Sequence, residues 1–350
     1  MPHRHEWRHG MAEGNEGDKA LRIPILDRLT GATGRWARAG IQFSGERAAL
    51  VLLGPDTGRP EILAAASVSA DEAPAAFADL LGRHRLRKAA ATLCLAPGEY
   101  ELLNMERPPV PDEELSESVR WKLGDLLPWP VDEAQVDVFT IPGLDSHARA
   151  ASWVFVVAAR RALVERRLQQ AERIGLQVTA VDIADFALRN LSARASAPQH
   201  SVAHLLVGED YSLVCISRGE VLYFSRDLQI GLGVLREAGE APEPGLSLEE
   251  GPREQLVLEV QRSLDYFDRH FAQPPVSRLI VSPPGTAGAL LQDALSASLP
   301  LQVLALGVEE LLPGAGPQII ESGLVDEPGV LLALGAAMRE LPALAAEDAA

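Results

Sequence analysis

The sequence is poor in cysteine, in aromatic residues and in basic residues. It has two cysteines, 5% aromatic residues, and 32 Lys plus Arg against 49 Asp plus Glu, which gives a formal charge of −17. Because phosphate recognition depends on Lys and Arg, this deficit argues against a nucleic-acid-binding protein and against direct adhesion to an anionic membrane. No apolar run is long enough for a transmembrane helix.

The two cysteines do not suggest redox or metal chemistry. Cys94 and Cys215 lie separately in short apolar runs, and no Cys-x-x-Cys pair occurs, so we expect two reduced, buried thiols and no metal site. Residues 1–34 are polar and lack the apolar core of a secretory signal. They predict a flexible leader whose true start is Met1 or Met11, and a cytoplasmic protein.

Hydrophobic residues make up 47% of the chain, enough for two or three domain-sized units. The patterning predicts two α/β halves, each of which begins with a β-meander that contains glycine turns. In the first half the strands lie in residues 38–53, 61–67 and 91–95, and in the second half they lie in 203–207, 212–217 and 221–224. Residues 151–183 read as strand–helix–strand, an order that favours parallel pairing of the two strands.

Five segments, in order, resemble the family of the MSHA-type pilus biogenesis protein MshI and, more distantly, the PilM family of type IV pili. The resemblance covers residues 36–340, and its most specific segments are 99–115, 119–123, 136–139, 181–191 and 258–267. It implies an α/β, actin-like fold that is related to FtsA, a duplicated ribonuclease H-like arrangement. Two lobes then surround a nucleotide cleft, and a PilM/FtsA-type subdomain is inserted in the first lobe.

The resemblance also implies domain boundaries. The expected units are a leader at 1–34, a first lobe at 35–96 with 180–199 and 326–341, an inserted subdomain at 97–179, a second lobe at 200–325, and a frayed tail at 342–350. Within the second lobe, 237–274 is expected to form a loop followed by a helix. The stretch 237–252 is rich in Pro, Gly and Glu, which is typical of a mobile loop.

Actin-like proteins hold Mg-nucleotide with glycine-bearing hairpins that usually carry an Asp. The equivalent residues here are Gly40, Gln42 and Ser44 in the first hairpin, Gly208, Glu209 and Asp210 in the second, and Ser282 and Gly285 in a late loop. Gln42 is neutral where a carboxylate would order Mg²⁺. Pro283 and Pro284 offer no N–H group in the loop that should surround the base. We therefore expect a degenerate site without catalytic residues or ATPase activity, and we disfavour ATP and Mg²⁺ as cofactors.

The resemblance implies a scaffold for MSHA-type or related type IV pilus assembly. Such a protein would sit at the cytoplasmic face of the inner membrane by binding the N-terminal tail of a bitopic PilN-like partner, and would meet other pilus assembly proteins. The sequence leaves open whether the chain forms a homo-oligomer. The alternative function is a nucleotide-dependent, actin-like ATPase or switch of the pilus or type II secretion machinery.

Three residues are candidate contacts for a partner protein because of their chemistry. Trp129 lies between two prolines, and Arg85 and Arg87 belong to a basic cluster at 83–88. Core packing explains Trp129 equally well. The basic cluster is also what the helix dipole favours at a helix C-terminus. The carboxylates of Glu259, Asp265 and Asp268 are more simply the solvated side of a helix than acid–base catalysts.

Overall fold

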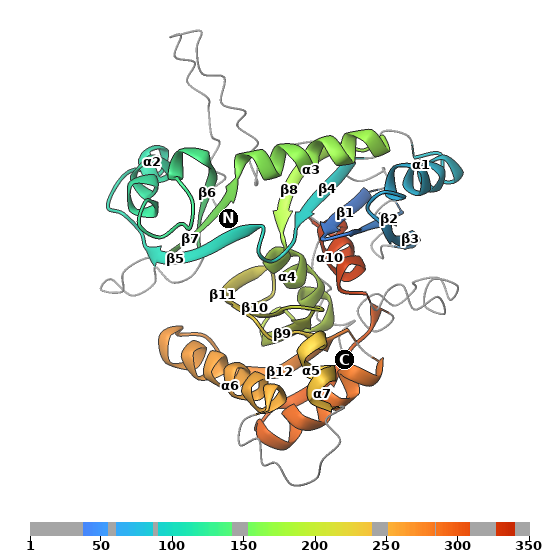
Figure 1. Ribbon diagram of the computed structural model, residues 1–350. Helices are drawn as coiled ribbons and strands as arrows, with labels where there is room; N and C mark the ends of the chain where they lie inside the picture. Colours follow the sequence, from blue (N-terminus) through green and yellow to red (C-terminus); the bar gives the residue numbers. More distant parts are fainter. Residues whose placement is uncertain are drawn as a thin grey trace.

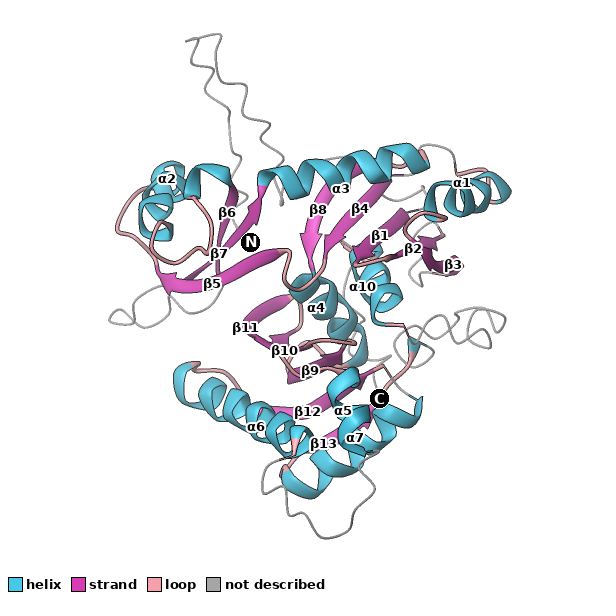
Figure 2. Cartoon of the chain, viewed as in Figure 1, coloured by secondary structure: helices cyan, strands magenta, loops and turns pink. Residues whose placement is uncertain are grey.

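A computed structural model describes residues 38–54, 61–86, 90–141, 153–239, 251–283, 285–308 and 327–339. The predicted leader at 1–34, the tail at 342–350 and most of the predicted loop at 237–252 lie outside the described residues. Two larger sheets and one small sheet form the framework (Figure 1), and helices cover their faces (Figure 2).

The first sheet has the order β3-β2-β1-β4-β8 among the described residues. Its strands are β1 (Arg38–Ser44), β2 (Arg47–Leu53), β3 (Ile62–Ser69), β4 (Ala90–Leu95) and β8 (Gln177–Ile183). β1, β2 and β3 form an antiparallel meander, whereas β4 and β8 continue the sheet in parallel pairing. The meander is a confirmed prediction, and Gly45 allows its first turn because its φ is +53°.

The second sheet repeats this plan, with the order β11-β10-β9-β12-β13. Its described strands are β9 (Ser201–Val207), β10 (Ser212–Arg218), β11 (Val221–Leu228), β12 (Val276–Ser282) and β13 (Gln302–Ala305). Again three antiparallel strands are followed by two parallel ones. The chain therefore consists of two lobes of equivalent topology, as the patterning predicted.

A small antiparallel sheet with the order β5-β7-β6 forms the inserted subdomain. It contains β5 (Tyr100–Glu106), β6 (Ala134–Thr140), β7 (Trp153–Arg160), α2 (Asp112–Leu123) and a 3₁₀ turn at Val131–Glu133. The predicted parallel pairing of 151–159 with 176–183 is wrong, because β7 lies in this sheet and β8 lies in the first lobe. The boundary expected at 179 accordingly falls inside β8.

α3 (Arg161–Ile174) connects the small sheet to the sheet of the first lobe, and it packs on α1 (Ala73–Arg83) in the first lobe. Gly175, with φ +90°, ends α3 and turns the chain into β8. The crossover from β7 therefore leaves the inserted subdomain, so the strand–helix–strand order connects two sheets.

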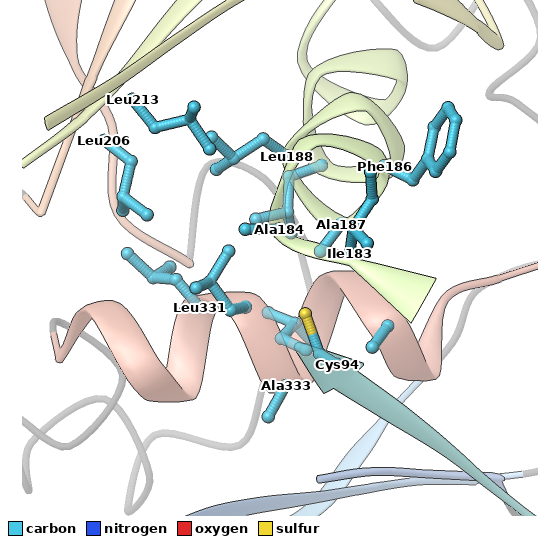
Figure 3. Close-up of a cluster of buried hydrophobic side chains, with 14 of the residues drawn as sticks. Cys94, Ile183, Ala184, Phe186, Ala187, Leu188, Leu206, Leu213, Leu331 and Ala333 are labelled. Carbon is cyan, nitrogen blue, oxygen red and sulfur yellow. The ribbon is translucent and has the colours of Figure 1, made fainter. Parts of the chain in front are cut away.

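α4 (Ala184–Ala195) and α10 (Pro328–Ala337) pack side by side at the centre of the molecule. Figure 3 shows apolar side chains of both helices gathered with those of the β4 end and the second-lobe sheet. Every residue of α10 from Val330 to Ala337 is buried. Such a helix is stabilised by burial on all sides and not by one apolar face.

The described part of the second lobe also contains the helices α5 (Leu232–Gly239), α6 (Pro252–His270) and α7 (Gly285–Ser298). α6 has an apolar stripe at helical spacings of three and four, because Leu256, Val260, Leu264 and Phe267 are all buried. α5 was not predicted, and it contains the first residues of the expected loop at 237–252. A helix this short has too few residues for a clear periodicity.

Candidate functional site: a cleft between the lobes

A cavity of about 940 Å³ lies where the two lobes and α10 meet. The β1–β2 hairpin forms one side, the turn between β9 and β10 forms the opposite side, and the start of α10 closes one end. Five of the residues grouped by sequence line this cleft together: Gln42, Ser44, Gly208, Glu209 and Asp210. Folding thus brings the two predicted hairpins to one site.

Gln42 is held against the first turn of α10. Its side chain is buried, and Nε2 donates a 3.3 Å hydrogen bond to the Phe43 carbonyl. A Cβ atom at Gly329 would lie 2.9 Å from Oε1 of Gln42, so a glycine at this point of α10 makes room for the amide. The first hairpin therefore presents a neutral side chain at this point of the cleft.

The second hairpin is tied to the start of α5. The Gly208 N–H donates to the Tyr211 carbonyl at 2.8 Å, and the N–H groups of Leu232 and Gly233 donate to the carbonyls of Gly208 and Glu209. A side chain at Gly208 would collide with the Tyr211 ring, 2.6 Å from the added Cβ. The Gly208 N–H is therefore engaged inside the turn, and it does not point freely toward a ligand.

Two predicted residues pack away from the cleft. Gly40 faces α10, where an added Cβ would lie 1.8 Å from the Ala333 carbonyl oxygen. Ser282 is buried, and its Oγ lies 3.0 Å from Nε2 of His204. Gly285 is the first residue of α7. Gly40 and Ser282 accordingly serve packing; in the late loop Pro283 lines the cleft.

The described lining of the cleft is acidic. Its carboxylates are Glu46, Glu209, Asp210, Asp227 and Glu327, and its one guanidinium belongs to Arg47. Arg47 is already bound, because its Nη2 lies 3.0 Å from Glu327 and donates to Ser67 as well. Burial, together with the nearby charge of Asp185, raises the pKa of Asp227 to about 6. The cleft thus offers a triphosphate little positive charge.

A second polar cluster, which the sequence did not reveal, lies at Asp185 beside the cleft. This buried carboxylate at the start of α4 accepts hydrogen bonds from Tyr100 of the inserted subdomain and from Ser225 of the second lobe. Burial raises the pKa of Asp185, and the two hydroxyl donors oppose this rise. The sequence signal was an acidic residue in the first turn of a helix, a pattern that is usual at any helix N-terminus.

Two of the predicted partner residues are described, and they lie in different subdomains. Trp129 is partly buried in the core of the inserted subdomain, with the Arg160 guanidinium 4.9 Å from its ring centroid. Arg85 follows α1 in the first lobe and has a φ of +57°. Arg87 lies outside the described residues.

The other candidates occupy ordinary structural positions. Asp265 and Asp268 are exposed, and Glu259 is paired with Arg226 and Arg262. Cys94 and Cys215 are free, buried thiols. In the described ranges there is no group of three His, Cys, Asp or Glu side chains arranged to hold a metal ion. Every helix of the described chain is too short or too polar to span a bilayer.

Two lobes of equivalent topology around a common cleft define an actin-like fold. Residues 105–238 match the family described as "Type IV pilus assembly protein PilM". This segment runs from the end of β5 through the inserted subdomain to α5, and the match to that family is limited to it. No curated protein matches the chain.

Three solved structures are similar to this chain. The "PilM-PilN type IV pilus biogenesis complex" is 22% identical, with a TM-score of 0.65 over 86% of this chain and 98% of that chain. The cytoplasmic domain of EpsL, an inner-membrane component of the Vibrio cholerae type II secretion system, is 13% identical, with a TM-score of 0.47 over 75% and 96%. A Bacteroides thetaiotaomicron protein of unknown function with an actin-like ATPase fold is 8% identical, with a TM-score of 0.47 over 85% and 99%.

Proposed function

We propose that this chain is a cytoplasmic scaffold of MSHA-type or related type IV pilus assembly that binds the N-terminal tail of a PilN-like inner-membrane protein. The match of residues 105–238 to the PilM family carries the proposal, because this segment contains most of the inserted subdomain. The likeness to a solved PilM–PilN complex over 98% of that chain supports it. Membrane attachment would then come through the partner, and the acidic chain needs no lipid contact of its own.

We further propose that the cleft does not hydrolyse ATP. Gln42 stands where the family pattern has an Asp, so the first hairpin lacks a carboxylate at the position that orders Mg²⁺ in that pattern. Arg47, the cleft's guanidinium, is bound to Glu327, and the described lining is otherwise acidic. Phosphate groups would therefore meet mostly repulsion in this cleft.

Calorimetry with the full chain tests the scaffold function. The titrant is a synthetic peptide of the N-terminal tail of the bitopic, PilN-like protein, and a scrambled peptide of the same composition is the control. We expect binding of about micromolar affinity for the tail and none for the scrambled peptide, as for other extended peptides held in a groove. Equal heats for both peptides, or none for the tail, would refute the proposal.

A nucleotide-dependent switch is the second candidate, because the cleft does bring both hairpins together around a 940 Å³ cavity. We expect no heat on titration with Mg-ATP and no phosphate release. The Gln42→Asp variant restores the carboxylate of the family pattern and is the matched control. Micromolar binding of Mg-ATP by the unmodified chain would favour a nucleotide-dependent switch over a scaffold that binds no nucleotide.

A further inference from the structure

α2 carries the most exposed large apolar side chain in the described part of the molecule. Trp121 is 86% exposed, whereas Leu115, Val119 and Leu123 of the same helix are buried against the three-stranded sheet. The apolar face of α2 is therefore complete without Trp121. Figure 1 places α2 at the outer end of the inserted subdomain, away from β1 and β2.

Carboxylates surround this tryptophan along the helix. Glu114 and Glu117 lie seven and four residues before Trp121, and both are exposed. Asp125 lies four residues after it and is also exposed. The helical turn continues to that point, because the N–H of Leu127 donates to the Leu123 carbonyl and Gly124 keeps helical dihedral angles. Side chains at spacings of four and seven share one helix face.

The basic residues of α2 do not neutralise this face. Both Nη atoms of Arg120 donate to backbone carbonyls, Nη2 to Val131 at 3.1 Å and Nη1 to Ala134 at 3.4 Å. Lys122 directly follows Trp121 and so points about 100° around the helix from it. The stripe of Glu114, Glu117, Trp121 and Asp125 thus joins an open indole ring to three carboxylates.

We propose that this stripe binds an arginine- or lysine-bearing peptide segment of a partner protein. A cation can stack on the indole face while its N–H groups donate to a flanking carboxylate, which is the combination that the stripe presents. Tryptophan is enriched at protein interfaces, and a face of this charge repels acidic and phosphorylated segments. The stripe lies on another surface than the interlobe cleft, and the proposal goes beyond tail binding.

The test uses the full chain and a short, capped peptide that alternates arginine with serine. Its counterpart carries citrulline in place of each arginine, which keeps the shape and removes the charge. We expect the arginine peptide to bind, the citrulline peptide not to bind, and the affinity to fall with rising salt. In ¹⁵N spectra, the indole N–H signal of Trp121 should shift first on titration.

Matched variants locate the binding. Trp121→Ala should raise the dissociation constant about five- to tenfold, and Glu117→Gln should raise it about twofold. Trp153, 40% exposed at the start of β7, and Glu165, exposed on α3, offer controls of the same chemistry. Trp153→Ala and Glu165→Gln should leave the dissociation constant unchanged. Equal affinity of Trp121→Ala and the unmodified chain, or equal binding of the citrulline peptide, would overturn the proposal.

Discussion

At the scale of single residues, the buried imidazole of His204 has a hydroxyl neighbour at each ring nitrogen. His204 on β9 lies between Ser192 of α4 and Ser282 of β12, with 3.0 Å from each ring nitrogen to a hydroxyl oxygen. The Ser192 hydroxyl donates to the Leu188 carbonyl at 2.8 Å, so Nδ1 of His204 donates to Ser192. The Ser282 hydroxyl lies between Nε2 of His204 and the Leu306 carbonyl oxygen, which is 3.4 Å from Ser282 Oγ. Burial disfavours the charged imidazole and lowers the pKa of His204 to about 3.

This histidine predicts a loss of stability in acid. Below the ordinary pKa of 6.5 the unfolded chain binds a proton that the folded chain excludes until about pH 3. The free energy of unfolding should therefore fall between those values, by at most about 1.4 kcal/mol per pH unit from this group. Urea unfolding of the unmodified chain and of His204→Gln, at pH 7 and pH 5, measures the difference. Parallel losses in both proteins would contradict the prediction.

At the scale of elements, α10 is the piece that holds the first lobe together. It packs on β1, β2 and α4. Its contacts with β1 and with α4 are close because each contains a glycine. A Cβ at Gly335 would lie 2.2 Å from the Ala187 carbonyl oxygen of α4, and one at Gly40 would lie 1.8 Å from the Ala333 carbonyl oxygen of α10. Backbone atoms cannot yield locally, so a side chain at either place would push whole elements apart.

Gly335→Ala should accordingly destabilise the protein by about 3 kcal/mol or more, through overpacking. Gly82→Ala is the matched control, because Gly82 is also helical and an added Cβ there would meet nothing within 4 Å. That change should leave stability unaltered or raise it by up to about 1 kcal/mol, through better helix propensity. Chemical denaturation of both variants provides the comparison. If the free energy of unfolding changed in the same direction in both variants, close packing of α10 would not explain why residue 335 is glycine.

At the scale of the whole molecule, three subdomains meet at one carboxylate. Asp185 belongs to α4, Tyr100 to the inserted subdomain and Ser225 to the second lobe. Asp182, at the end of β8, lies 3.6 Å from Nη1 of Arg339 just after α10. The relative placement of the subdomains is therefore stabilised by buried polar contacts as well as by apolar packing.

A double-mutant cycle tests this junction. Tyr100→Phe and Ser225→Ala should each lower the free energy of unfolding by about 1–2 kcal/mol, because each removes a donor to a buried carboxylate. The two effects should not add, since both hydroxyls bind one group. In the Asp185→Asn background each loss should shrink, because a neutral amide needs its donors less. Fully additive losses that are unchanged by Asp185→Asn would show that Asp185 does not couple the subdomains.

The local elements were predictable because their signals are local. The antiparallel meanders follow from runs of β-forming residues broken at Gly45 and Gly219, both with φ above +50°. The stripe on α6 follows from helical spacing, and the burial of Cys94 follows from its apolar neighbours. Gln42 and Glu209 could be assigned to one cleft because the resemblance named both hairpins.

The sequence by itself determined which segments become strands and helices, and that the α/β plan is repeated in two halves. Only the tertiary structure decided that β7 and β8 lie in different sheets, that Gly40 packs on α10, and that Asp185 joins three subdomains. Patterning depends on neighbouring residues and sets which face is apolar. Which faces then meet depends on packing between segments far apart in the chain, and no short-range period records it.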